Sequence, residues 1–241
     1  MSRQLMQRFC VLTTGRSGST ALMKALDLHK HISLPDQSIS CDDYELLHPN
    51  KCQTYVRYFE QLAKHPINTP AQLVDAFYAA NTQLEFAGFK SMPGRDRTFR
   101  ALGQRTDITF ITLVRRDIPS TIASFMLAME KGTWRRAGGQ SLHRWRFTPA
   151  KEQQVLSNLA YLKQSFRMLE SVPNAIRLYY EDLCQPDYSS PQLEIYFGHP
   201  ITFERHVPPT SAATYVENWP EFKQFVLTAW QQSAAVMAVH A

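Results

Sequence analysis

The chain has few cysteines and no long apolar run, and each of these absences excludes a class of protein. Its 241 residues include 4 cysteines. The cysteines show neither C-x-x-C nor zinc-ligand spacing, which argues against a dithiol motif or a metal site and favours free thiols. No apolar run approaches the ~18 residues of a membrane span, and Met1–Arg8 lacks the apolar stretch of a secretory signal. We therefore expect a cytoplasmic protein.

The overall composition is that of a folded protein with a modest excess of positive charge. Hydrophobic residues make up 44% of the chain and charged residues 20%, with a formal net charge of +5. Such a charge fits an ordinary soluble protein, and it also fits one that binds an anion, because positive charge steers anions toward clefts. The arginines form no long basic run, so nucleic acid is not an expected partner.

Apolar runs alternate with helical patterns along the chain, which predicts an α/β fold with a parallel sheet flanked by helices. A further helix should begin after Thr69, since threonine, proline and glutamine then occupy the N-cap, N1 and N3 positions of a capping box. No repeat or linker interrupts the pattern, so residues 1–241 are expected to form one domain. The expected strands are 9–12, 86–92, 108–114 and 175–179, and the other expected helices are 20–28, 51–65, 119–129, 151–170 and 220–230.

The most distinctive motif lies between the first expected strand and the first expected helix. It consists of Thr14, Gly15, Arg16, Ser17, Gly18, Ser19 and Thr20. Glycines let the backbone bend tightly at such a place, and the free N–H groups and dipole at the following helix start form an anion site. The hydroxyl groups of Ser17, Ser19 and Thr20 would add neutral hydrogen-bond donors.

This loop differs from the loop that binds nucleoside triphosphates, which has the pattern G-x-x-x-x-G-K-S/T. When the two are aligned on Gly18, Ser19 stands where the lysine belongs and Thr13 where the first glycine belongs. The nearest cation is Arg16, and no apolar strand ends in a lone aspartate that could help to hold Mg²⁺. The loop therefore predicts a group that is less charged than the triphosphate of ATP and is bound without metal. A metal-dependent P-loop kinase is the alternative enzyme.

A second possible anion site follows the expected strand 108–114. Arg115 and Arg116 stand at its carboxyl end, where open parallel sheets bind ligands. In a helix that begins near Pro119, Ser124 lies about five residues inside, a rise of roughly 7.5 Å, so Arg116 and Ser124 could share one anion. A surface arginine beside an unrelated serine is the simpler alternative. Strand ends spaced by about 4.8 Å would hold two such sites as far apart as two phosphates on one ribose.

In this order and spacing the motifs resemble those of sulfotransferases, which use 3′-phosphoadenosine 5′-phosphosulfate (PAPS). The segment Leu113–Arg135 is most similar to bacterial trehalose-type sulfotransferases. The resemblance implies a P-loop-like α/β sheet, with Gly15–Thr20 holding the 5′-phosphosulfate and Arg116 and Ser124 the 3′-phosphate. Other segments that resemble the family are Gly88-Phe89-Lys90, Tyr180-Glu181-Asp182-Leu183 and Glu217-Asn218-Trp219.

The resemblance implies transfer of a sulfuryl group from PAPS to a hydroxyl of a small molecule or glycan. Arg16, the loop amides and the helix dipole would then stabilise negative charge on the leaving 5′-phosphate. Lys90 would add a second cation, although a lysine extending from a strand end for structural reasons is an equal alternative. Tyr180 to Leu183 would have a structural role, as the start of a helix after a strand. A nucleotide-binding module without catalysis is the alternative from another class.

The acceptor hydroxyl also needs a base, which in this family is commonly a glutamate after the first helix. The register from His29 places that position near Asp36 and Gln37, whereas an insertion would shift it to Glu45. We rank Glu45 before Asp36, and the remaining alternatives are a histidine such as His29 or no base at all.

Two regions remain open in the sequence. The basic and aromatic stretch 134–145, which includes Trp134 and Trp145, is a candidate acceptor surface or a plain exposed loop. The tail 231–241 fits either packing against a second copy in a homodimer or fraying.

Overall fold

The computed structural model describes residues 5–35, 44–47, 52–93, 102–103, 105–131, 144–185, 188–201, 203 and 212–238, with side chains to residue 232. The chain divides into two compact units. The first unit comprises Met1–Val114 and Ser165–Arg205, and the second comprises Arg115–Gln164 and His206–Ala241. The single domain expected from the sequence stays a prediction.

The first unit contains a parallel sheet with β1 at its centre. Among the described residues the strand order is β2-β3-β1-β4-β5, and every neighbouring pair is parallel. The predicted parallel sheet is therefore confirmed, and only the two-residue strand β2 was missed. The strands are β1 (Gln7–Thr13), β2 (Ile32–Ser33), β3 (Phe86–Ser91), β4 (Thr109–Val114) and β5 (Ile176–Tyr179).

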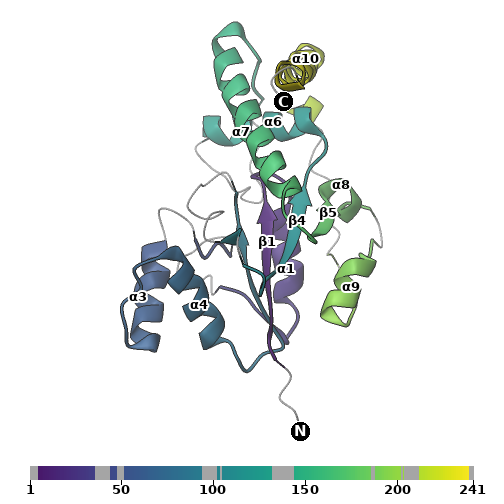
Figure 1. The fold of residues 1–241 in the computed structure, drawn as a ribbon. Helices are drawn as coiled ribbons and strands as arrows, with labels where there is room; N and C mark the ends of the chain where they lie inside the picture. The colour runs from purple at the N-terminus through teal and green to yellow at the C-terminus, as the bar shows by residue number, and fades with distance from the viewer. Residues whose placement is uncertain are drawn as a thin grey trace. The chain divides into compact units, whose positions relative to one another are not determined.

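Helices cover both faces of this sheet (Figure 1). Successive side chains of a strand point to opposite faces, so β1 serves two cores. Its Phe9 and Val11 pack with α1 and α9, whereas Cys10 and Leu12 pack with α3 and α4. The helices of this unit are α1 (Ser19–Asp27), α3 (Cys52–Ala63), α4 (Pro70–Ala80), α8 (Tyr180–Leu183) and α9 (Pro191–Phe197).

The capping box that the sequence predicts at the start of α4 is confirmed. The Thr69 hydroxyl accepts a hydrogen bond of 3.2 Å from the Gln72 backbone N–H, and the Gln72 side chain accepts one of 3.0 Å from the Thr69 N–H. Pro70 occupies the first helical position, where its missing N–H costs no intrahelical bond.

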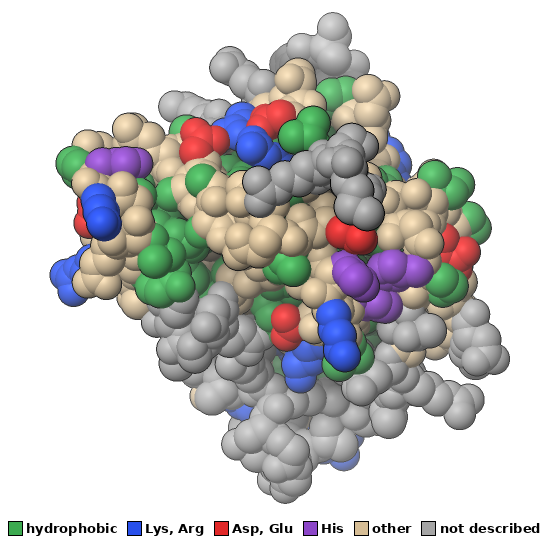
Figure 2. Space-filling model, turned by 90° about the horizontal axis from the view of Figure 1, so that it is seen from below, with side chains coloured by type: hydrophobic (Ala, Val, Ile, Leu, Met, Phe, Trp, Pro, Cys, Tyr) green, Lys and Arg blue, Asp and Glu red, His purple; other side chains and the backbone are tan. Residues whose placement is uncertain are grey.

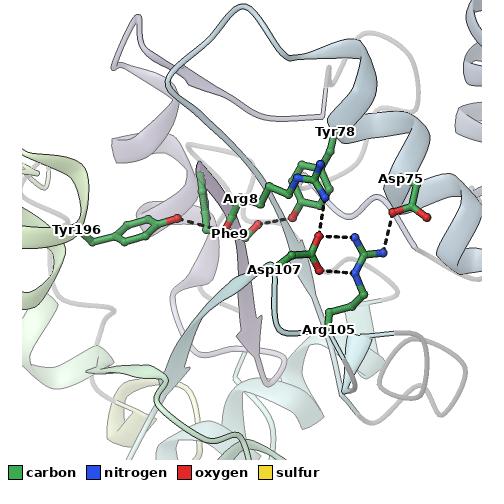
Figure 3. Close-up of polar contacts among 7 residues, drawn as sticks. All are labelled: Arg8, Phe9, Asp75, Tyr78, Arg105, Asp107 and Tyr196. Carbon is green, nitrogen blue, oxygen red and sulfur yellow. Dashed lines mark hydrogen bonds and ion pairs between the residues drawn. The ribbon is translucent and has the colours of Figure 1, made fainter. Parts of the chain in front are cut away.

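A charged network fastens the amino-terminal ends of β1 and β4 to α4 (Figure 3). Arg105 makes two hydrogen bonds of 2.7 Å to the Asp107 carboxylate and a third of 2.7 Å to Asp75. Arg8 pairs with the same Asp107 and lies 5.2 Å from the centre of the Tyr78 ring. The hydrogen bonds from Arg105 are the main reason why the pKa of Asp107 lies well below its ordinary range.

The second unit is helical in its described residues. Its elements are α6 (Ile118–Lys131), the 3-10 turn η1 (Pro149–Lys151), α7 (Glu152–Glu170), the 3-10 turn η2 (Ala212–Thr214) and α10 (Trp219–Ala238). From Ser165 onward, α7 belongs to the first unit. No helix in the described part of the chain combines the length and the apolarity that crossing a membrane requires.

The start of α10 holds the segment around Phe147 through one side-chain amide. Asn218 accepts a hydrogen bond of 2.9 Å from the Phe147 N–H and donates one of 3.0 Å to its carbonyl oxygen. Trp145 is only 3% exposed and packs edge-on against Phe222. The prediction that Trp145 belongs to an acceptor surface is therefore wrong, because its large apolar indole is buried in the interior and does not face solvent. Trp134 lies outside the described residues.

Candidate active site

The loop between β1 and α1 has the backbone geometry of an anion site. Arg16 and Gly18 both adopt left-handed conformations, with φ of 61° and 80°. Left-handed residues within such a turn direct consecutive N–H groups to one side. Gly18 is the N-cap of α1, no side chain caps this end, and the first turn holds no acid. The first amides of α1, at Ser19 and Thr20, are therefore in the position from which a helix start donates hydrogen bonds to an anion.

The hydroxyl of Ser17 serves the loop itself. Ser17 and Thr13 are fully buried and their hydroxyls bond to each other. The Ser17 hydroxyl also reaches the Thr14 carbonyl oxygen at 2.8 Å, and the Thr13 hydroxyl reaches the Leu113 carbonyl oxygen of β4 at 3.1 Å. Two hydroxyl protons cannot supply these bonds and an anion as well. Ser17 would thus meet a ligand through its backbone N–H.

Tyr180 packs against the loop at Gly18. A Cβ atom built on Gly18 would lie 2.3 Å from Cδ2 and 2.5 Å from Cε2 of the Tyr180 ring. These distances are far shorter than a van der Waals contact between carbons, which is about 3.5–4.0 Å. Residue 18 therefore has to be glycine for two reasons, its positive φ and the tyrosine ring beside it.

Lys90 and Glu45 form a buried ion pair near the carboxyl end of β3. Lys90 Nζ lies 3.5 Å from Glu45 Oε1, and the two side chains are 1% and 9% exposed. Tyr44 and Glu45 run parallel to β3 there, with the Lys90 N–H donating to the Tyr44 carbonyl oxygen at 2.9 Å. Lys90 is in register with Val11, so its side chain lies on the face that α1 covers. The structure thus brings together the predicted second cation and the preferred base.

Two buried hydroxyl groups lie at the carboxyl ends of β1 and β3: that of Thr14, which belongs to the predicted motif, and that of Ser91, which the sequence analysis missed. Thr14 is the residue after β1, and Ser91 is the last residue of β3. Both hydroxyl oxygens are buried, and neither has a hydrogen-bond partner in the part of the chain that the structure describes. Buried polar atoms nearly always find a partner, so an unpaired one indicates a water or a ligand. No sequence pattern identifies Ser91, because its burial depends on the neighbouring strands.

The predicted second anchor lies in the second unit. Asp117 caps α6, since its carboxylate accepts a hydrogen bond of 3.1 Å from the Ser120 N–H. Arg116 is exposed just before this cap, and Ser124 is buried on α6, one turn beyond Ser120. That Arg116 and Ser124 share an anion, and that they act with the Gly18 loop, stays a prediction.

The alternative base His29 lies at the other end of the sheet. It follows α1, whose nine residues carry the chain about 13 Å away from the loop. The neighbouring His31 carbonyl oxygen accepts from the N–H of Phe86, the first residue of β3. The rings of His29 and His199 stack with their centroids 4.5 Å apart. Histidine side chains gather on the face of the molecule that Figure 2 shows. A base role for His29 at the loop is therefore wrong. Asp36 lies outside the described residues.

Before any comparison, the described residues define an α/β fold in which a glycine-serine loop follows the central strand of a parallel sheet. Neither the known protein-family models nor the curated proteins include a match. Among solved structures, the chain is similar to the sulfotransferase domain from the Synechococcus PCC 7002 olefin synthase. The TM-score is 0.53 at 16% identity, over 97% of each chain. The likeness is one of fold, and it agrees with the sulfotransferase resemblance of the sequence; the trehalose-type subgroup stays a prediction.

Proposed function

We propose that this protein is a PAPS-dependent sulfotransferase that acts on a hydroxyl of a small molecule or glycan. The observation that carries the proposal is the loop after β1, in a fold similar to that of a sulfotransferase domain. Its left-handed Arg16 and Gly18 and the uncapped start of α1 suit a phosphate. The lysine that clamps the outer phosphates of ATP is absent, because Ser19 stands in its place.

The residues present fit PAPS as a co-substrate. The amides of Ser19 and Thr20, with the Arg16 guanidinium, would hold the 5′-phosphosulfate, and Arg116 with Ser124 would hold the 3′-phosphate. PAPS supplies the sulfuryl group, and its 5′-phosphate oxygen retains the electron pair of the broken S–O bond. Donors fixed before the reaction stabilise such developing charge without reorganising.

Glu45 is the proposed base for the acceptor hydroxyl. As the new O–S bond forms, the hydroxyl proton passes to the Glu45 carboxylate. Lys90, 3.5 Å from this carboxylate, holds it beside the end of β3 and adds positive charge on the α1 face. Asp36 is the alternative base. Full turnover by Glu45→Gln together with a loss of turnover in Asp36→Asn would reverse this order.

Thermal unfolding with different nucleotides tests the proposed donor. Adenosine 3′,5′-bisphosphate should stabilise the protein without Mg²⁺, by about 2.7 kcal/mol at 100 times its Kd. ADP and ATP, which carry no 3′-phosphate, should stabilise it less. Stabilisation by ATP with Mg²⁺ alone would refute the proposal in favour of a metal-dependent kinase. Binding of the bisphosphate without sulfuryl transfer to any acceptor would favour a nucleotide-binding module.

Arg116→Ala tests the proposed 3′-phosphate contact. Loss of a charged hydrogen bond should weaken bisphosphate binding by about 1.5–3 kcal/mol, whereas binding of 5′-AMP should hardly change. Calorimetric titration of both nucleotides makes the comparison. Equal losses for the two would show that Arg116 does not read the 3′-phosphate.

A further inference from the structure

We propose that Tyr180 is a positioning residue for the anion loop: the edge of its ring holds the backbone at Gly18 and thereby aims the first amides of α1. The ligand in this inference is that of the proposed function. The contact runs through the ring edge, since Cδ2 and Cε2 are the atoms nearest to a Cβ placed on Gly18, and Cγ is 3.6 Å away. The phenol hydroxyl is not among these atoms.

The topology explains why a ring at this position can restrain the loop. Tyr180 begins α8 directly after β5, and β5 pairs with β4, which pairs with β1. The ring therefore reaches the loop from two strands away, about 9.6 Å at the usual strand spacing. The Thr13 hydroxyl fastens the same loop to the Leu113 carbonyl oxygen of the intervening β4. The loop is thus tied to both strands on this side of β1.

The restraint matters because of the conformational freedom of glycine. Without a Cβ, Gly18 populates many backbone conformations, yet α1 begins only if it keeps its left-handed φ of 80°. The Tyr180 ring occupies one side of this glycine and limits the alternatives. Removal of the ring should therefore weaken anion binding by allowing the backbone at Gly18 to move.

Nucleotide affinity is the first test. Adenosine 3′,5′-bisphosphate and inorganic pyrophosphate are titrated calorimetrically into the wild type, Tyr180→Phe and Tyr180→Leu. Tyr180→Leu should bind both ligands about ten- to a hundredfold more weakly, the usual effect of small misplacement of a binding group. Tyr180→Phe should bind within about twofold of the wild type, because it keeps the ring edge. Tyr188→Leu, at a half-buried tyrosine that packs on Phe203, is the matched control and should bind normally.

A double-mutant cycle on urea unfolding tests the contact itself. Gly18→Ala introduces both backbone strain and a clash with the ring, and only the clash disappears in Tyr180→Ala. Gly18→Ala should therefore lower the urea midpoint less in the Tyr180→Ala background than in the wild type. Equal shifts in both backgrounds, or unchanged ligand affinities in Tyr180→Leu, would overturn the positioning role. If the wild type binds pyrophosphate but not the bisphosphate, the proposed function fails, while the pyrophosphate series and the cycle still decide the role of Tyr180.

Discussion

Replacing Glu45 by glutamine should destabilise the protein far more than replacing Glu45 and Lys90 together. Unit charges 3.5 Å apart, the separation of Lys90 Nζ and Glu45 Oε1, attract each other by about 5 kcal/mol at an effective dielectric constant of ~20. Withdrawing each charge from water costs several kcal/mol, so the intact pair contributes little net stability. A single replacement removes the attraction but leaves the other group's desolvation cost, and should therefore cost about 3–5 kcal/mol.

Urea unfolding at neutral pH measures this difference. The series comprises Glu45→Gln, Lys90→Met and the double variant, in which a neutral pair of similar volume should recover most of the loss. Glu130→Gln is the control: Glu130 pairs with Lys151, but both side chains keep about a quarter of their surface exposed, at 23% and 27%. Its cost should stay below about 1 kcal/mol. A double variant that loses the sum of the two single losses would refute the argument.

Three further predictions concern the ends of the sheet and the helix caps. Hydrogen bonds from Arg105 keep the pKa of Asp107 below the ~3.9 of an unfolded chain. The ionised Asp107 therefore stabilises the fold fully above about pH 4, and this stabilisation is lost at lower pH. Urea midpoints should accordingly fall less between pH 5 and pH 2.5 in Asp107→Asn than in the wild type; an identical fall would contradict this. Thr69→Ala should cost about 1 kcal/mol in urea unfolding, whereas Thr148→Ala, at an N-cap whose side chain makes no capping bond, should cost almost nothing; equal costs would refute the role of the capping box. Burial lowers the pKa of His29 from 6.5, so protonation opposes folding and stability should decline below about pH 6.5. His29→Phe should flatten that decline between pH 7.5 and pH 5.5, and an unchanged slope would exclude His29 as its source.

Local signals in the sequence were sufficient for most elements of the fold. Apolar runs of strand length marked four of the strands, and the Thr69 capping box marked the first residue of α4. The glycine-serine loop between β1 and α1 was also visible, because tight turns and helix starts depend on residues adjacent in the chain. The short α9 was missed, since seven residues carry too little periodicity to be recognised.

Contacts between distant segments were not predictable in the same way. The pattern around Trp145 looked like an exposed surface, but the indole is buried against Phe222. Ser17 looked like a ligand donor, but its hydroxyl is held by Thr13 and the Thr14 carbonyl oxygen. In each case the residue type is compatible both with a solvent-facing position and with a buried one, and only its neighbours in space decide between them.

The sequence alone determined the class of fold, the position of the glycine-serine loop and the absence of a triphosphate-type lysine, because these depend on periodicity and on short-range backbone chemistry. Only the tertiary structure decided that Lys90 pairs with Glu45 and that Tyr180 packs on Gly18. These groups come from segments far apart in the chain, and the parallel register of the strands is what brings their ends to one edge of the sheet.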